Sequence, residues 1–104
     1  MPDFDVIISG GGIVGASAAL CLARRDRRVL LVDSKVPQTS SFNDEFDVRT
    51  VALSPRSIQL LESLGAMANV RRESVKHIRV WEREGTATIV FDAGEIGARV
   101  LAEV

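Results

Sequence analysis

The sequence has one cysteine and one histidine, so it has very few of the residues that form disulfides or zinc sites. Cys21 is the only cysteine, which excludes an intrachain disulfide and agrees with a reducing cytosol. It lies in a stretch rich in alanine and leucine, where a thiol usually packs as a small apolar group. His77 is the only histidine and has no cysteine near it in the sequence. We therefore expect no metal site.

An excess of charge of one sign is also lacking. The 13 Lys and Arg residues nearly balance the 14 Asp and Glu residues, which leaves a net charge of −1. This balance argues against nucleic acid as a partner. The basic cluster Arg24–Arg28 is interrupted by Asp26, and we interpret it as a helix end. No apolar run is long enough to span a membrane.

The first third of the chain contains the pattern of a βαβ unit. The run Val6–Ile8 is apolar on both faces, which predicts a strand buried in a parallel sheet. Residues Ile13–Arg25 predict a helix, and Asp26 tolerates the left-handed conformation needed after it. Val29–Val32 predicts a second buried strand, and Ser34–Asp47 predicts a long polar loop. The expected fold class is α/β, with a right-handed crossover.

A glycine-rich motif joins the first strand to the helix. The run Gly10–Gly15 matches G-x-G-x-x-G. In this motif Gly10 permits a tight turn, Gly12 lets the backbone approach a pyrophosphate, and Gly15 lets the helix pack closely on the strand. The helix start offers N–H groups and the positive end of its dipole to phosphates.

Asp33 ends the second strand, where an acidic side chain accepts hydrogen bonds from ribose hydroxyls. The glycines follow a buried strand, open a helix and precede this acid within a unit of about 30 residues. This context predicts a dinucleotide site rather than a plain glycine turn. The acid favours FAD or NAD over NADP, and the motif alone does not separate FAD from NAD.

The second half of the chain predicts a helix and a hairpin. Ser54 and Pro55 suit the N-cap and first position of a helix that ends near Gly65. The runs Val75–Arg83 and Thr86–Phe91 have the character of strands and are joined by a turn, which predicts an antiparallel hairpin.

Several segments carry a resemblance to a known family. Asp3–Ile8, leading into the glycines, resembles the start of FAD-dependent aromatic hydroxylases of the p-hydroxybenzoate hydroxylase fold. The segments that resemble the ubiquinone-biosynthesis hydroxylases, of the 2-polyprenylphenol hydroxylase type, are Asp47–Ser54, Leu61–Gly65, Val80–Trp81 and Val90–Asp92. The resemblance covers almost the whole chain and implies that the cofactor is FAD.

The resemblance also implies a set of cofactor-binding residues. Position 33 is usually glutamate in the family, so Asp33 is one methylene shorter than expected. Arg49 matches an arginine near the flavin and pyrophosphate; the alternative is a surface salt bridge with Asp47 or Glu45. We predict no catalytic residue and no metal ligand in this chain. The predicted cofactor-binding residues are Gly10, Gly12, Ile13, Val14, Gly15, Asp33, Ser34 and Arg49.

The implied activity is that of a flavin monooxygenase, which hydroxylates the ring of a polyprenylated phenol or quinol with NAD(P)H as electron donor. We expect a cytoplasmic protein, peripheral to the inner membrane. Family members are several times longer, so we expect an N-terminal fragment that is inactive alone. Residues 1–72 would form part of a Rossmann-like FAD-binding domain, and residues 73–104 would start the substrate-domain sheet with its first β-hairpin.

Two alternatives stay open. The chain could be an FAD- or NAD-binding part of another oxidoreductase, such as an amine oxidase or a dehydrogenase. It could also be a non-catalytic nucleotide-binding or interaction module. In that case, an exposed apolar face on the hairpin would drive self-association.

Overall fold

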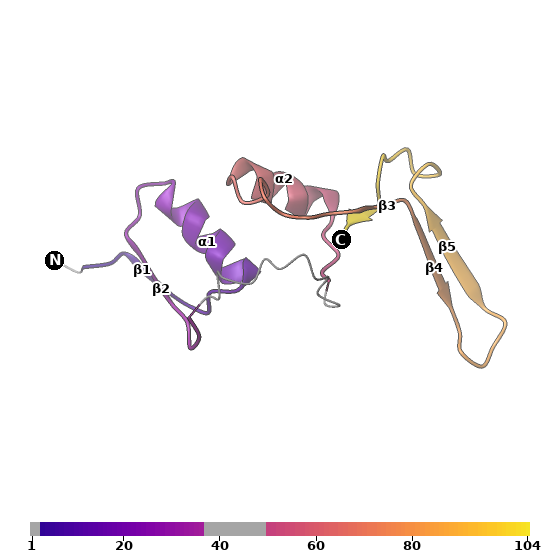
Figure 1. Ribbon diagram of the computed structural model, residues 1–104, viewed down its shortest axis with the longest axis horizontal. Coiled ribbons are helices and arrows are strands. Elements are labelled where there is room, and N and C mark those ends of the chain that lie inside the picture. Colours follow the sequence, from indigo (N-terminus) through magenta and orange to yellow (C-terminus); the bar gives the residue numbers. More distant parts are fainter. Residues whose placement is uncertain (1–2, 37–49) are drawn as a thin grey trace. The chain divides into compact units, whose positions relative to one another are not determined.

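The computed structural model describes residues 3–36 and 50–104 (Figure 1). These residues belong to two units, Met1–Phe46 and Asp47–Val104, and each unit is described by itself.

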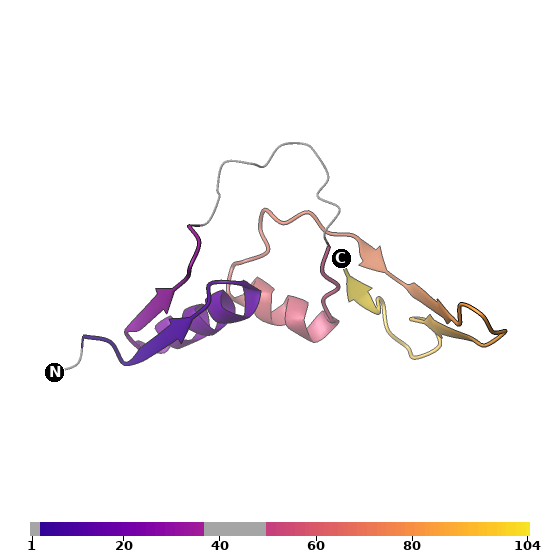
Figure 2. The same ribbon diagram turned by 90° about the horizontal axis from the view of Figure 1, so that it is seen from below.

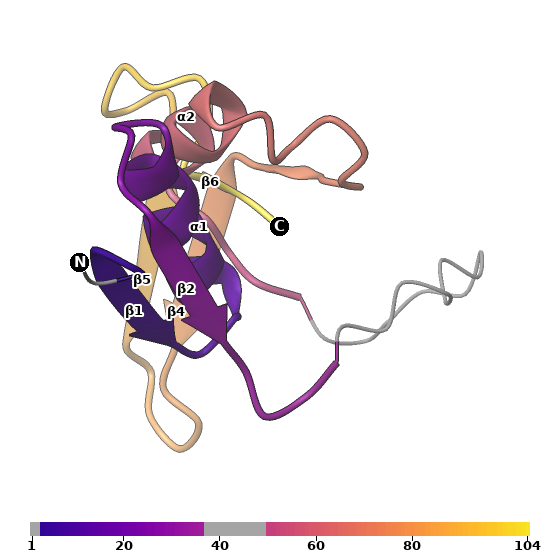
Figure 3. The same ribbon diagram turned by 90° about the vertical axis from the view of Figure 1, so that its left-hand side faces the viewer.

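The first unit is a strand–helix–strand arrangement. Strands β1 (Val6–Ser9) and β2 (Val29–Val32) pair in parallel, with Val6 opposite Val29 at one end of the register. Helix α1 (Ile13–Ala23) connects them and contacts both strands (Figures 1 and 3). The predicted βαβ unit and the α/β class are confirmed. The helix is two residues shorter than predicted, because the chain turns from Arg24 onward.

The turn after α1 brings the chain back to the start of β1. Asp26 has φ of 58°, the left-handed conformation predicted for it. Beyond this turn, the Arg28 N–H donates to Asp5 Oδ2 at 2.8 Å, and the Arg28 guanidinium lies 3.1 Å from Asp5 Oδ1. The hydrogen bonds from Arg28 lower the pKa of Asp5. The last turn of α1 holds no basic residue, so the arginine cluster follows the helix and Arg28 pairs with Asp5.

The two strands are less buried than their sequence predicts. The side chain of Ile7 is 67% exposed, and Leu31 and Val32 are also exposed. Strands that are apolar on both faces normally lie inside a larger parallel sheet that is covered on both sides. Within residues 3–36 the sheet has two strands and one helix, so the expectation of fully buried strands is wrong for this chain.

The core of the second unit lies beneath a short helix, α2 (Pro55–Ser63). The Ser54 side chain accepts a hydrogen bond from the Ser57 N–H at 3.3 Å, and Pro55 occupies the first turn, as predicted. Gly65 ends the helix with φ of 73°. The buried apolar side chains are Ile58, Leu61, Leu64 and Ala93.

Four short strands complete the described part of this unit, residues 50–104. Strands β4 (His77–Trp81) and β5 (Thr88–Asp92) form the predicted antiparallel hairpin, which extends away from α2 (Figure 2). Strand β3 (Ser74–Val75) pairs with β6 (Ala102–Glu103).

Strand β6 is the centre of the second unit. On one side it pairs with β3, and on the other the backbone of Glu103 exchanges hydrogen bonds of 2.8 and 2.9 Å with Leu53. Helix α2 also contacts β6. These contacts join residues on both sides of the boundary predicted after residue 72, and the division into domains 1–72 and 73–104 stays a prediction.

We predict that Asp5→Asn lowers the free energy of unfolding at neutral pH. The pKa of Asp5 is lowered in the folded chain, so its contribution to stability is fully present above the ordinary aspartate pKa of 3.8 and is lost as the pH falls through the native pKa. The difference from the parent chain should therefore shrink in acid. Urea unfolding followed by circular dichroism, at neutral pH and well below pH 3.8, measures this difference in the free energy of unfolding.

Asp3→Asn is the matched control, because it removes the same charge just outside β1. Equal destabilisation by both substitutions would assign the effect to net charge and not to the pair with Arg28.

Candidate functional site

The glycine loop follows the carboxyl end of β1. Its first position has a backbone conformation that favours glycine. Gly10 has φ of +106°, a conformation that side chains disfavour. Its N–H donates to the carbonyl oxygen of Val32 at 2.7 Å. This bond ties the start of the loop to the end of β2, so the loop lies where both parallel strands end. In open α/β sheets that edge is the usual place for ligands.

The start of α1 is left open for an anion. Gly12 is the N-cap residue, and no side chain caps the helix there. The Ala16 N–H donates to the Gly12 carbonyl at 2.9 Å, so the N–H groups of Ile13, Val14 and Gly15 have no intrahelical acceptor. The first turn holds no acidic residue that would repel a phosphate. A pyrophosphate could accept hydrogen bonds from these N–H groups.

Gly12 and Gly15 differ in what surrounds them. A Cβ atom added at Gly12 would meet no protein atom within 4 Å. A Cβ atom at Gly15 would overlap the carbonyl oxygen of Gly10 and would lie 3.5 Å from Cγ2 of Ile8. Gly15 is thus required for close packing of α1 on the loop and β1. The space at Gly12 is open and would admit a cofactor, so the loop fits a dinucleotide.

Asp33 lies directly beside this loop. Its Oδ2 accepts a hydrogen bond from the Gly11 N–H at 2.7 Å, and its Oδ1 accepts one from the Lys35 N–H at 3.0 Å. The backbone N–H groups of Lys35 and Gly11 lower the pKa of Asp33, and Ser34 lowers it further. The carboxylate is therefore charged at neutral pH and lies at the glycine loop. Its binding of a ribose stays a prediction.

The structure brings together seven of the predicted cofactor-binding residues and does not describe the eighth. Gly10, Gly12, Ile13, Val14 and Gly15 form the loop and the first turn of α1, and Asp33 and Ser34 follow β2 beside it. Arg49 lies outside the described residues, together with Asp47 and Glu45. The sequence reasoning missed Gly11, which the motif leaves unrestricted; the only signal was a glycine where any residue is allowed.

Other parts of the described chain form no competing centre. Residues 3–36 and 50–104 contain no cluster of three metal-binding side chains. His77 instead pairs with Asp92 across the hairpin, with 2.8 Å between Nε2 and Oδ2. In the same residues no helix is long and apolar enough to cross a membrane.

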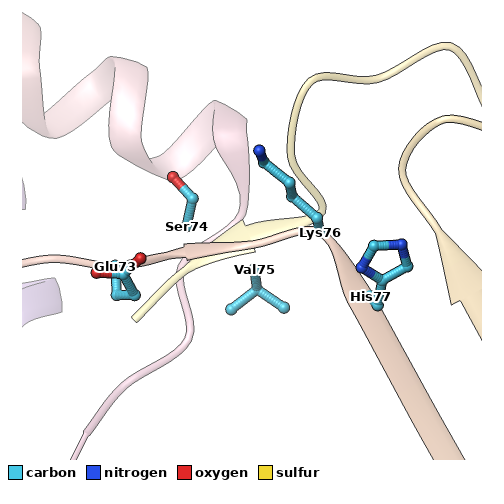
Figure 4. A pocket seen from close by; sticks show the side chains of 5 residues that line it. All are labelled: Glu73, Ser74, Val75, Lys76 and His77. Carbon is cyan, nitrogen blue, oxygen red and sulfur yellow. The ribbon is translucent and has the colours of Figure 1, made fainter.

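A shallow depression in the second unit is lined by residues from one stretch of chain. Figure 4 shows its side chains, which all come from one continuous segment that includes β3 and the first residue of β4. They are Glu73, Ser74, Val75, Lys76 and His77. This depression contains no residue of the glycine loop, and we do not regard it as the cofactor site.

Comparison with known proteins decides the family. Residues 5–99 match the family described as FAD dependent oxidoreductase, which covers both units and includes the glycine loop. The chain belongs to this family. Its fold is thereby a Rossmann-like FAD-binding α/β fold, as predicted, and FAD is the family's cofactor.

Curated relatives of the chain are named for ubiquinone biosynthesis. It is 36% identical over 95 residues to 3-demethoxyubiquinol 3-hydroxylase of Escherichia coli, which covers 88% of this chain and 24% of the relative. It is 32% identical over 97 residues to the human ubiquinone biosynthesis monooxygenase COQ6, and this match covers 86% of this chain and 21% of the relative. It is 36% identical over 97 residues to COQ6 of Drosophila melanogaster, and this match covers 85% of this chain and 20% of the relative. The chain thus spans between a fifth and a quarter of these relatives' length.

We predict different effects for alanine at two glycines of the loop, Gly15 and Gly12. Gly15→Ala should destabilise the first unit by about 1–3 kcal/mol, because its Cβ overlaps the Gly10 carbonyl. Gly12→Ala should cost less than about 1 kcal/mol in stability, but should weaken FAD binding by about tenfold or more, because the Cβ fills the space left for the pyrophosphate. Thermal unfolding and flavin fluorescence titration measure the two effects.

Gly65→Ala serves as a control outside the loop, since it strains a left-handed turn of the second unit and leaves the loop sequence unchanged. If Gly12→Ala leaves FAD affinity unchanged, the pyrophosphate does not lie where the loop places it.

Proposed function

We propose that this chain is the N-terminal FAD-binding portion of a flavin monooxygenase that hydroxylates the aromatic ring of a polyprenylated phenol or quinol in ubiquinone biosynthesis. The observation that carries the proposal is the open glycine loop at the uncapped start of α1, in a chain of the FAD-dependent family. The names of the relatives supply the substrate class.

Each part of the loop has a distinct task in this proposal. The N–H groups of Ile13, Val14 and Gly15 would hold the pyrophosphate, and the dipole of α1 would favour its negative charge. Asp33 and Ser34 would bind the adenosine ribose, and Arg49 would donate to the cofactor phosphates or flavin. FAD supplies the redox chemistry, with NAD(P)H as electron donor, and the chain itself contributes binding and orientation.

The hairpin of the second unit suits the start of a substrate domain. In the proposed arrangement, residues 1–72 belong to the FAD-binding domain and the β4–β5 hairpin is the first hairpin of the substrate-domain sheet. One face of that hairpin is apolar, because Ile78 and Val80 face the same side as their register partners Phe91 and Ile89. All four side chains are exposed. A polyprenylated substrate also suits a cytoplasmic enzyme that works at the periphery of the inner membrane.

A segment exchange tests the proposed function. The matched segment of the Escherichia coli hydroxylase is replaced by this chain, and the chimera is expressed in cells that lack the hydroxylase. We expect ubiquinone synthesis to be restored, and the purified chimera to contain FAD. The same chimera with Gly12→Ala should retain about tenfold less FAD at equal FAD concentration.

The outcomes separate the alternatives. A folded chimera that contains FAD but makes no ubiquinone would favour another flavin oxidoreductase. A folded chimera without FAD would remove the basis for the cofactor assignment itself.

The exposed hairpin face supports a second proposal, self-association of the isolated chain. Val80 and Ile89 are directly opposite each other, so the double substitution Val80→Lys/Ile89→Glu replaces an apolar pair by an ion pair in the same register. We expect the parent chain to associate as its concentration rises, and the double variant to stay monomeric, in analytical ultracentrifugation.

Arg79→Gln is the control on the opposite face of β4. A parent chain that is monomeric at every concentration would contradict self-association, as would a double variant that associates equally well.

A further inference from the structure

Asp33 makes two hydrogen bonds that have nothing to do with a ribose. Its Oδ1 accepts from the N–H of Lys35, two residues on, which is an Asx-turn. Its Oδ2 accepts from the N–H of Gly11 at 2.7 Å, across the space between the end of β2 and the glycine loop. The Asx-turn fixes the carboxylate, and the fixed carboxylate holds the loop.

Gly11 has a steric reason to be glycine that the motif does not contain. A Cβ atom at this position would lie 2.9 Å from Oδ2 of Asp33, closer than real Cβ atoms approach. The first x of G-x-G-x-x-G is otherwise free. Because of the short hydrogen bond from Gly11 to Asp33, the residue that one position accepts depends on the residue at the other. The two positions follow the ends of different strands.

The length of the side chain at position 33 matters for this bond. Only aspartate and asparagine form an Asx-turn to the N–H two residues ahead. A glutamate would keep the charge but lose that turn, and an asparagine would keep the turn but could not accept from both Lys35 and Gly11, since its second terminal atom is a donor. Aspartate alone makes both bonds seen here.

We propose that Asp33 is a positioning residue that fixes the glycine loop in its cofactor-ready conformation through Gly11, before any ligand arrives. Each carboxylate oxygen has more than one acceptor site, so a ribose hydroxyl can share the carboxylate with the loop. The inference rests on the proposed function only in naming FAD as the ligand; the bond between Asp33 and Gly11 is a property of the chain itself.

Amide hydrogen exchange of the isotopically labelled chain without FAD tests the link directly. We expect the Gly11 N–H to exchange about tenfold faster in Asp33→Asn and in Asp33→Glu, because hydrogen bonds to a charged acceptor are the stronger ones. Asp26→Asn is the matched control, which removes the same charge from the turn after α1 and should leave Gly11 unchanged. Unchanged exchange in both Asp33 variants would overturn the proposal.

A double-mutant cycle adds a readout that simple loss of structure does not give. Gly11→Ala should weaken FAD binding about tenfold or more in the parent chain, because its Cβ displaces Asp33. In an Asp33→Ala background the same substitution should have a clearly smaller effect, since the clash is gone. Strict additivity would contradict the coupling of the two positions.

The parent chain alone provides a further test if a variant fails to fold. On acid titration, the chemical shift of the Gly11 N–H should follow the protonation of Asp33, with a midpoint below 3.8. A Gly11 shift that does not follow Asp33 would overturn the proposal. If Gly11 responds as expected but FAD binds neither the chain nor the chimera, the proposed function fails while the link between Asp33 and the loop stands.

Discussion

The close approach of α1 to the end of β1 is the constraint on which the first unit depends. At Gly15 the helix backbone comes so near the Gly10 carbonyl that no side chain fits between them. That approach aims the start of the helix at the carboxyl ends of both strands. The bond from Gly10 to Val32 then fixes the loop against β2, which places Asp33 beside it. The geometry of this candidate cofactor site therefore depends on close backbone packing more than on side-chain contacts.

The features predictable from the sequence were those with a local cause. The βαβ order, the helix start at Ser54 and the left-handed turn at Asp26 each follow from a few adjacent residues, and the structure has all three. The hairpin could likewise be predicted, because its two strand-like runs and the turn between them lie within one short stretch.

Features with a distant cause could not be predicted. The pairing of β6 with β3 joins residues almost thirty positions apart, and its pairing with Leu53 joins residues fifty positions apart. No local sequence pattern predicts either pairing. The bond between Gly11 and Asp33 depends on how two strand ends meet in space. The burial of β1 and β2 was overestimated for a different reason: their composition suits a larger covered sheet, and two strands with one helix do not supply it.

The place of β6 has a consequence for how the chain folds during synthesis. The first unit can close once β2 has left the ribosome, because all its contacts lie within a short span. The second unit has its helix and hairpin early, yet its central strand is supplied by residues 102–103. Non-local pairing of this kind is slow, since a long loop must close before any contact compensates for the lost entropy. The buried face of α2 is therefore exposed to chaperones and to other nascent chains for longer than the glycine loop is.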